Sequence, residues 1–114
     1  MDGTVQGKAA SDLELRVARA LSQLKIEFIF QYPIKRGRDR IGGFVVDFIA
    51  QTPPKDTPIL VHGEYWHRPS NKSDPVELAI LRSMRQFAEP LILWGADLQS
   101  EAEALDAVRQ GLGL

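Results

Sequence analysis

Two histidines, a carboxylate and two aromatic side chains fall within six residues, in the run His62-Gly63-Glu64-Tyr65-Trp66-His67. Imidazole titrates near neutral pH, so either histidine could take the proton of an attacking water or stabilise a leaving oxygen. His62 and Glu64 share one face if the strand is regular, whereas a bulge at Gly63 would break this parity. Such a cluster of titratable groups favours a functional site over isolated structural histidines.

Asp47 is the second candidate, because it interrupts the otherwise apolar run 44–50. A carboxylate in a buried strand loses hydration and requires a partner, a metal ion or contact with solvent. Mg²⁺ usually takes one or two protein carboxylates together with waters and substrate phosphate, so Asp47 and Glu64 predict a Mg²⁺ site that Mn²⁺ can also fill. An edge position facing water is the alternative for Asp47. A zinc site of Asp47, His62 and His67 has no HExxH spacing or cysteine pair to support it.

Capping patterns predict three helices. Ser11-Asp12-Leu13-Glu14 is a capping box, and Ser100-Glu101-Ala102-Glu103 precedes a last helix. Asp74-Pro75 predicts a middle helix that ends near Glu89-Pro90. The apolar stripes at helical spacing are Leu13, Val17, Leu21 and Leu24 in the first helix, Val76, Ile80, Met84 and Phe87 in the second, and Leu105, Val108 and Leu112 in the third.

Four strands are expected between these helices. Alternation over 26–30 predicts the first strand, 44–50 is a buried second strand, 58–62 begins a third that runs toward Trp66, and 91–94 is a short buried fourth. The first three in a row suggest an antiparallel meander. The expected order is αβββαβα in a single α/β domain over residues 1–114, with residues 1–10 flexible and Trp94 in the core. Asp97 needs no catalytic role.

The composition is that of an ordinary globular protein. The chain has 114 residues, 44% hydrophobic and 25% charged, which is typical of one globular domain. It has no cysteine, which excludes disulfides, thiolate zinc sites and cysteine nucleophiles. No apolar run predicts a membrane span or signal peptide, so a cytoplasmic location is expected. The net charge of -1 excludes binding of nucleic acid by bulk charge alone.

Charge is unevenly spread along the chain. Residues 8–40 hold eight basic and four acidic residues, whereas residues 89–114 hold five acidic residues and one basic residue. A basic cluster around the candidate site fits contact with phosphates, with Tyr65 or Trp66 stacking on a base, although a solvated hairpin tip is the alternative. The acidic last helix is expected to face away from DNA. The basic residues expected to contact DNA are Lys35, Arg36, Arg38, Arg40, Arg68 and Lys72.

These residues resemble a known family. The element order, Glu14 in the first helix, Asp47 in the second strand and the pattern HGxxWH after the third resemble the very short patch repair (Vsr-type) endonucleases of the PD-(D/E)XK nuclease superfamily, from about Ser11 to Leu98. The resemblance implies a restriction-endonuclease-like αβββαβα core, with a mixed central sheet flanked by helices. It also implies hydrolysis of a DNA phosphodiester bond.

The resemblance implies a role for each matching position. Asp47 would bind Mg²⁺, and the carbonyl of Val61 is a possible second ligand. His62 and His67 would be the catalytic histidines, and Glu14 would help to orient water or metal, although the capping box explains Glu14 equally well. Tyr65-Trp66 matches the aromatic pair that enters the DNA stack.

The chain departs from the family at several positions. Leu60 and His62 stand where the superfamily has an acid and a lysine, and Glu64 would supply the missing carboxylate. The cysteines of the repair enzymes' structural zinc are absent, as is their apolar N-terminal wedge. The expectation is therefore a Mg²⁺-dependent endonuclease that nicks DNA as a monomer, with a larger assembly possible. The alternatives are an inactive nuclease-fold module that binds DNA or assembles with proteins, and a purely protein-binding subunit docked through its acidic last helix.

Overall fold

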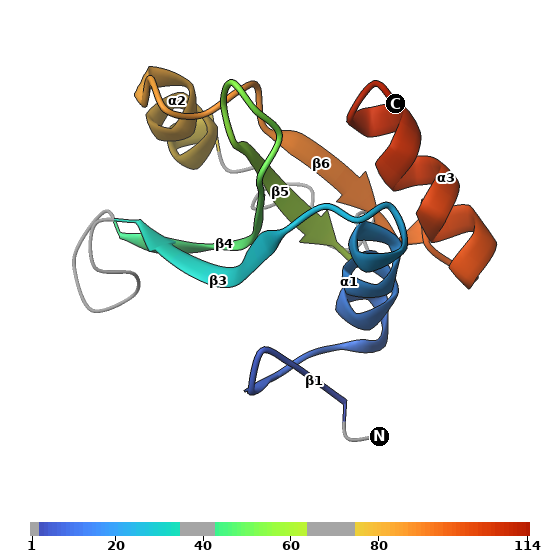
Figure 1. The fold of residues 1–114 in the computed structure, drawn as a ribbon. Helices are drawn as coiled ribbons and strands as arrows, with labels where there is room; N and C mark the ends of the chain where they lie inside the picture. Colours follow the sequence, from blue (N-terminus) through green and yellow to red (C-terminus); the bar gives the residue numbers. More distant parts are fainter. Residues whose placement is uncertain (1–2, 35–42, 64–74) are drawn as a thin grey trace.

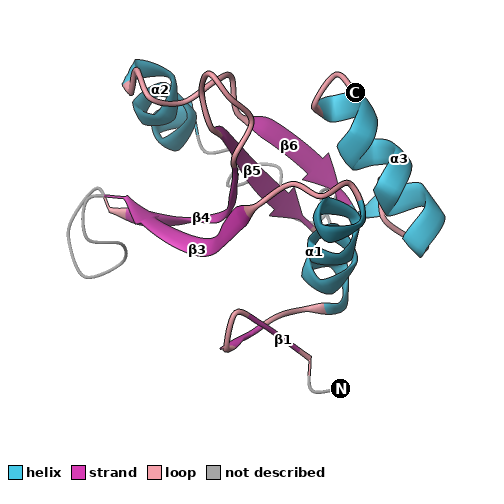
Figure 2. Ribbon diagram, viewed as in Figure 1, coloured by secondary structure: helices cyan, strands magenta, loops and turns pink. Residues whose placement is uncertain are grey.

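The computed structural model describes residues 3–34, 43–63 and 75–114. Its larger elements follow the expected order αβββαβα (Figures 1 and 2). In chain order the elements are β1 (Thr4–Val5), β2 (Lys8–Ala9), α1 (Asp12–Gln23), β3 (Phe28–Ile34), β4 (Phe44–Ala50), β5 (Thr57–His62), α2 (Pro75–Ser83), β6 (Leu91–Trp94), the 3-10 turn η3 (Gly95–Asp97) and α3 (Glu101–Gly111). No helix in these described ranges has the length and apolar character needed to cross a bilayer.

The main sheet is mixed and has the strand order β3-β4-β5-β6. β3, β4 and β5 pair antiparallel, which confirms the predicted meander. β6 pairs parallel with β5, with α2 in the connection between them. β3 and β6 are therefore the two edges of the sheet.

Helices cover both faces of this sheet. Ile59 and Leu60 are adjacent in β5 but belong to different apolar clusters, because successive strand residues point to opposite faces. In Figure 1, α1 and α3 lie beside each other and α2 lies at the other end of the sheet. The α1–α3 cluster consists of Val5, Val17, Ala18, Ala20, Leu21, Phe30, Phe48, Ala50, Ile59, Leu93, Leu98, Ala104 and Val108. The α2 cluster consists of Ile34, Phe44, Val46, Ile49, Leu60, Leu78, Leu81 and Phe87.

Helix α1 begins with the predicted capping box. The N–H of Glu14 donates to Ser11 Oγ at 3.1 Å, and the N–H of Ser11 donates to Glu14 Oε1 at 2.9 Å. The helix ends in a Schellman motif, in which Ile26 N–H donates to the carbonyl of Leu21 and Lys25 N–H to that of Ser22. Lys25 occupies the left-handed position of this motif with φ 63°, where glycine is usual.

The middle helix is shorter than predicted. α2 ends at Ser83 and not near Glu89-Pro90. Phe87 is buried, but it reaches the core from a short parallel bridge with Asp56, and Ala88 N–H donates to the carbonyl of Asp56. This bridge uses backbone groups that a continued helix would need. Val76 was expected in the apolar stripe, but its side chain is 64% exposed.

Residues 3–10 form an element that the sequence analysis did not predict. β1 and β2 pair as a small antiparallel hairpin, and Val5 is buried in the α1–α3 cluster. The side chain of Gln6 bonds along β3, donating to the carbonyl of Phe28 at 2.8 Å and accepting from the N–H of Phe30 at 2.9 Å. The outer edge of β3 is therefore partly covered by this hairpin.

Candidate functional site

Asp47 lies at a break in the pairing of β3 with β4. The two strands pair on both sides of this position, but Asp47 and Gln31, which face each other in the register, form no ladder pair. Gln31 has φ 58°, the left-handed conformation, which costs a non-glycine residue roughly 1–2 kcal/mol. The side chains of β3 also change faces there. Phe30 belongs to the α1–α3 cluster, whereas Tyr32, two residues later, packs against the α2 cluster on the opposite face.

The pairing of β4 with β5 ends beside the same residue. Its last pair within the described strands is Phe48 with Ile59. Beyond it, the N–H of Val61 donates to Asp47 Oδ2 at 2.7 Å, so a side-chain carboxylate takes the place of a backbone acceptor. The length is that of a charge-assisted hydrogen bond. Asp47 is therefore fixed in a gap between three strands and is only half-buried.

The chemistry of this gap suits a hard cation. An ionised carboxylate has about four lone-pair sites, so it can accept several partners at once, and a metal ion can be one of them. The N–H and C=O of one strand residue point to the same edge, which directs the carbonyl of Val61 toward the side of β5 where Asp47 lies. Both are oxygen donors of the kind that Mg²⁺ prefers.

His62 ends β5 next to this gap and is half-buried. Its ring meets the ring of Trp94 edge-on, with centroids 5.0 Å apart and planes at 90°, and its Nδ1 atom is buried. Trp94 is the register partner of His62 in the parallel pair β5–β6, so the sheet itself brings the two rings together. Trp94 is half-buried, and it supports the candidate histidine rather than only filling the core.

The chain after His62 is fixed by close backbone contact. A Cβ on Gly95 would overlap the carbonyl oxygen of Gly63, so this approach of β5 to the start of η3 requires glycine at position 95. A Cβ on Gly63 would lie 3.7 Å from Leu13 Cδ1, which places the first turn of α1 beside the same point. The catalytic run predicted from the sequence therefore begins at a closely packed position.

Glu14 lies in that first turn of α1, but its carboxylate is used in the capping box with Ser11. This structural role, which the sequence alone already offered as an alternative, is the one observed. The role of Glu14 in orienting water or a metal ion remains a prediction.

Several predicted site residues lie outside the described ranges. These are Glu64, Tyr65, Trp66, His67, Arg68, Lys72, Lys35, Arg36, Arg38 and Arg40. Among residues 3–34, 43–63 and 75–114, no three histidine or acidic side chains gather in a group that could hold a metal ion. The described site consists of Asp47, Val61 and His62, with Gln31 and Trp94 as neighbours that the sequence analysis did not assign to it.

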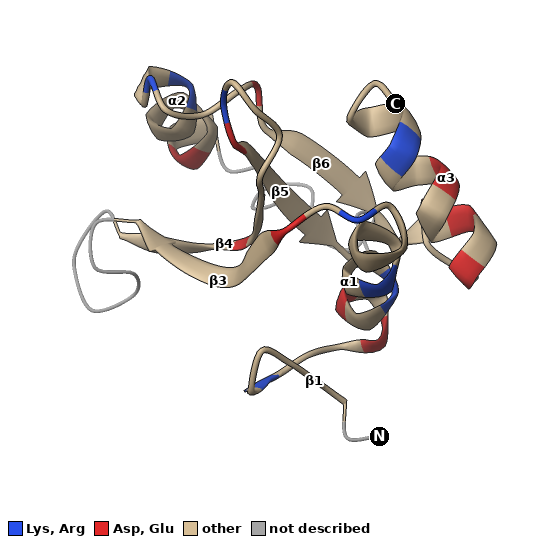
Figure 3. Cartoon of the chain, viewed as in Figure 1, with Lys and Arg blue, Asp and Glu red and all other residues tan. Residues whose placement is uncertain are grey.

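Ion pairs stabilise the surface away from this gap. Arg19 of α1 and Glu101 of α3 are 2.7 Å apart, and this hydrogen bond lowers the pKa of Glu101 below its ordinary value. Arg82 and Glu89 form a similar pair at 2.6 Å, which lowers the pKa of Glu89 in the same way. Figure 3 shows acidic positions along α3, as the sequence predicted for the last helix.

Comparison with protein-family models, curated proteins and solved structures finds no match.

Proposed function

We propose that this chain is a Mg²⁺-dependent DNA endonuclease of the Vsr-like type, with a restriction-endonuclease-like core. One observation carries the proposal: the carboxylate of Asp47 lies in a gap of the central sheet, bonded to Val61 directly before the run that starts at His62. In a regular pairing the N–H of Val61 would bond to a backbone carbonyl, so a carboxylate at this position is more than the sheet itself requires. A charged group there costs desolvation, and such groups cluster at functional sites.

The topology supports the same proposal. A three-stranded meander followed by a helix and a parallel fourth strand gives a mixed sheet with helices on both faces. The resemblance implies this arrangement. Asp47 lies on the second strand of the meander, and the resemblance implies a metal-binding aspartate on this strand.

Asp47 and the carbonyl of Val61 would hold the Mg²⁺, with Glu64 as a further carboxylate two residues after His62. The ion would neutralise the charge that develops on the phosphate. His62 or His67 would take the proton of the attacking water or give one to the leaving oxygen, as the new P–O bond forms and the old one breaks. Because Nδ1 of His62 is buried, we assign its proton exchange to Nε2.

DNA is the proposed substrate because basic residues flank this site in the sequence. Lys35, Arg36, Arg38 and Arg40 follow β3, and Arg68 and Lys72 follow the histidine run. They would track phosphates, while Tyr65 or Trp66 would stack on a base. We propose that one chain supplies one site and nicks one strand.

A second candidate function follows from Leu60. This residue stands at the superfamily's usual acid position, and its side chain is only 5% exposed and packed in the α2 cluster. The core thus uses this position for packing. The alternative is a catalytically inactive nuclease-fold module that binds DNA or assembles with other proteins.

Nicking of supercoiled plasmid by the full chain tests the proposal. The wild-type protein should nick with Mg²⁺ or Mn²⁺ and not with EDTA, and Asp47→Asn should fall to the metal-free background. Glu27→Gln, which changes an exposed carboxylate directly before β3, is the matched control and should keep full activity. Equal nicking by wild type and Asp47→Asn would refute the catalytic assignment. Salt-sensitive DNA binding without metal-dependent nicking would favour the inactive module.

A further inference from the structure

The two edges of the main sheet differ in their cover. At the β3 edge, Gln6 bonds to the backbone of Phe28 and Phe30, and Lys8 Nζ donates to the carbonyl of Phe30 at 3.4 Å. At the β6 edge, no described strand pairs with Leu91–Trp94 on the side away from β5. The strand itself has the sequence Leu-Ile-Leu-Trp, without a lysine, proline or bulge. Edge protection is confined to its start, where Pro90 precedes the strand and Gly111 of α3 packs against the side chain of Leu91.

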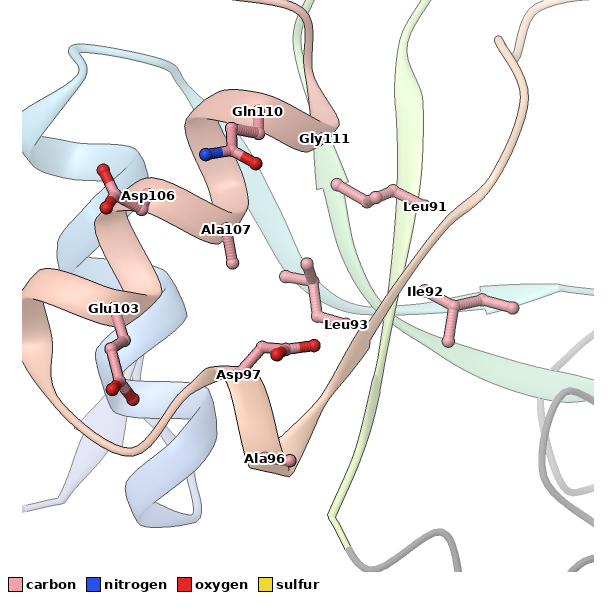
Figure 4. Close-up of a pocket in the computed structure, with 10 residues that line it drawn as sticks. All are labelled: Leu91, Ile92, Leu93, Ala96, Asp97, Glu103, Asp106, Ala107, Gln110 and Gly111. Atoms are coloured by element: carbon pink, nitrogen blue, oxygen red, sulfur yellow. The ribbon is translucent and has the colours of Figure 1, made fainter.

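A groove of about 600 Å³ runs along this open edge, between β6 and α3 (Figure 4). Leu91, Ile92 and Leu93 all line it. Leu91 and Leu93 pack toward the α1–α3 cluster, whereas Ile92 packs toward the α2 cluster on the opposite face. A groove that touches three consecutive strand residues must follow the backbone edge of the strand, and not one of its faces.

The floor of the groove is apolar and its rim is acidic. Leu93 and Ala107 lie at the floor, and Asp97, Glu103 and Asp106 are the charged residues of the lining. Asp106 pairs with Arg109 of the same helix at 2.8 Å, so the net negative charge of the rim comes from Asp97 and Glu103. An extended cationic chain would match this rim, whereas a nucleic acid strand would be repelled by it.

The same charges disfavour pairing of β6 with the β6 of a second copy of the chain. Such a pair would bring two acidic rims together, and juxtaposition of like charges is unfavourable. The occupant must therefore supply positive charge, apolar side chains and free backbone groups at the same time.

We propose that the groove binds an extended segment of a protein partner, rich in lysine or arginine and alternating with apolar residues, by adding it as a fifth strand beside β6. Backbone hydrogen bonds to the open edge would give affinity, and the acidic rim would select the cationic side chains. This site is independent of the proposed nuclease activity.

Titration of the ¹⁵N-labelled full chain tests this proposal, with the peptide acetyl-Lys-Val-Lys-Val-Lys-Val-amide as the probe. Amide shifts should concentrate in Leu91–Trp94 and Glu101–Gly111. A peptide with glutamate for lysine should not bind, and one with alternate N-methylated bonds should lose binding because it cannot donate to the strand edge. No shifts at β6 and α3, or equal binding of either control peptide, would overturn the proposal.

Charge reversal on the protein gives a second measurement. The double variant Asp97→Lys/Asp106→Lys changes two exposed side chains and should weaken peptide binding by about fivefold or more at low salt. Asp12→Lys/Glu27→Lys makes the same change of net charge at exposed positions outside the groove, and its binding should stay within about twofold of wild type. Equal weakening by both variants would show only a general charge effect and would overturn the assignment to this groove.

Discussion

Substitutions at Asp47 separate its structural role from its proposed chemical role. The carboxylate accepts the N–H of Val61 at 2.7 Å in a half-buried gap of the sheet. Asp47→Ala removes the acceptor and leaves this N–H without it, which should cost about 1–3 kcal/mol of the free energy of unfolding. Asp47→Asn keeps an oxygen acceptor and loses only the charge, so its cost should be about 1 kcal/mol or less.

Thermal unfolding followed by circular dichroism measures the difference. A domain of this size shifts its Tm by about 4 °C per kcal/mol, so Asp47→Ala should melt roughly 4–12 °C below wild type. Asp47→Asn should melt within about 4 °C of wild type. Both variants should lose nicking, since neither carries the carboxylate proposed to hold Mg²⁺.

The control is Glu27→Ala, which removes an exposed carboxylate and should change stability by less than about 0.5 kcal/mol. Two outcomes would refute the reasoning. If Asp47→Ala unfolds at the wild-type temperature, the bond to Val61 does not support the sheet. If Asp47→Asn is destabilised as much as Asp47→Ala, the charge and not the acceptor is what the fold requires.

Three further predictions concern other positions. Lys25→Gly should raise the free energy of unfolding by about 0.5–1 kcal/mol, because glycine adopts φ 63° without the Cβ clash, and a lower urea midpoint would contradict it. Gly95→Ala should cost about 1–3 kcal/mol, because the added Cβ overlaps the carbonyl of Gly63; an unchanged Tm would show that the two backbones can separate. Glu101→Gln should lower the Tm near neutral pH, and the difference in Tm from wild type should vanish as the pH falls below about 4. The lowered pKa of Glu101 means that its ion pair with Arg19 adds stability only while the carboxylate is ionised. A difference in Tm that persists in acid would therefore exclude this ion pair as its cause.

Local signals were enough to predict most elements of the fold. The capping box at Ser11 and the N-cap at Ser100 are each formed within four residues, and the helices begin where these motifs predict. The strands over 44–50 and 91–94 also have the predicted bounds, because Gly43 precedes the first apolar run and Pro90 and Gly95 flank the second. These features depend on neighbours in the sequence and not on the tertiary structure.

Distant contacts decided what the sequence could not predict. α2 stops at Ser83 because the chain around Phe87 bonds to Asp56, a pairing that no helical pattern reveals. The site shows the same limit. Asp47 was found as a charge in an apolar strand, but the left-handed Gln31 opposite it and the N–H of Val61 that holds it follow from the sheet register.

The contact between α1 and α3 bears on the order in which the chain can fold. Arg19 and Glu101 are 82 residues apart, as are Arg16 and the carbonyl of Leu98, to which its side chain donates. Val17 of α1 is fully buried in a cluster that includes Val108 of α3. During synthesis the first helix is therefore made long before the surface that covers it, and closing so long a loop slows folding. A nascent chain that still lacks α3 exposes the apolar face of α1, and it is at this stage that the protein is most open to aggregation and to capture by chaperones.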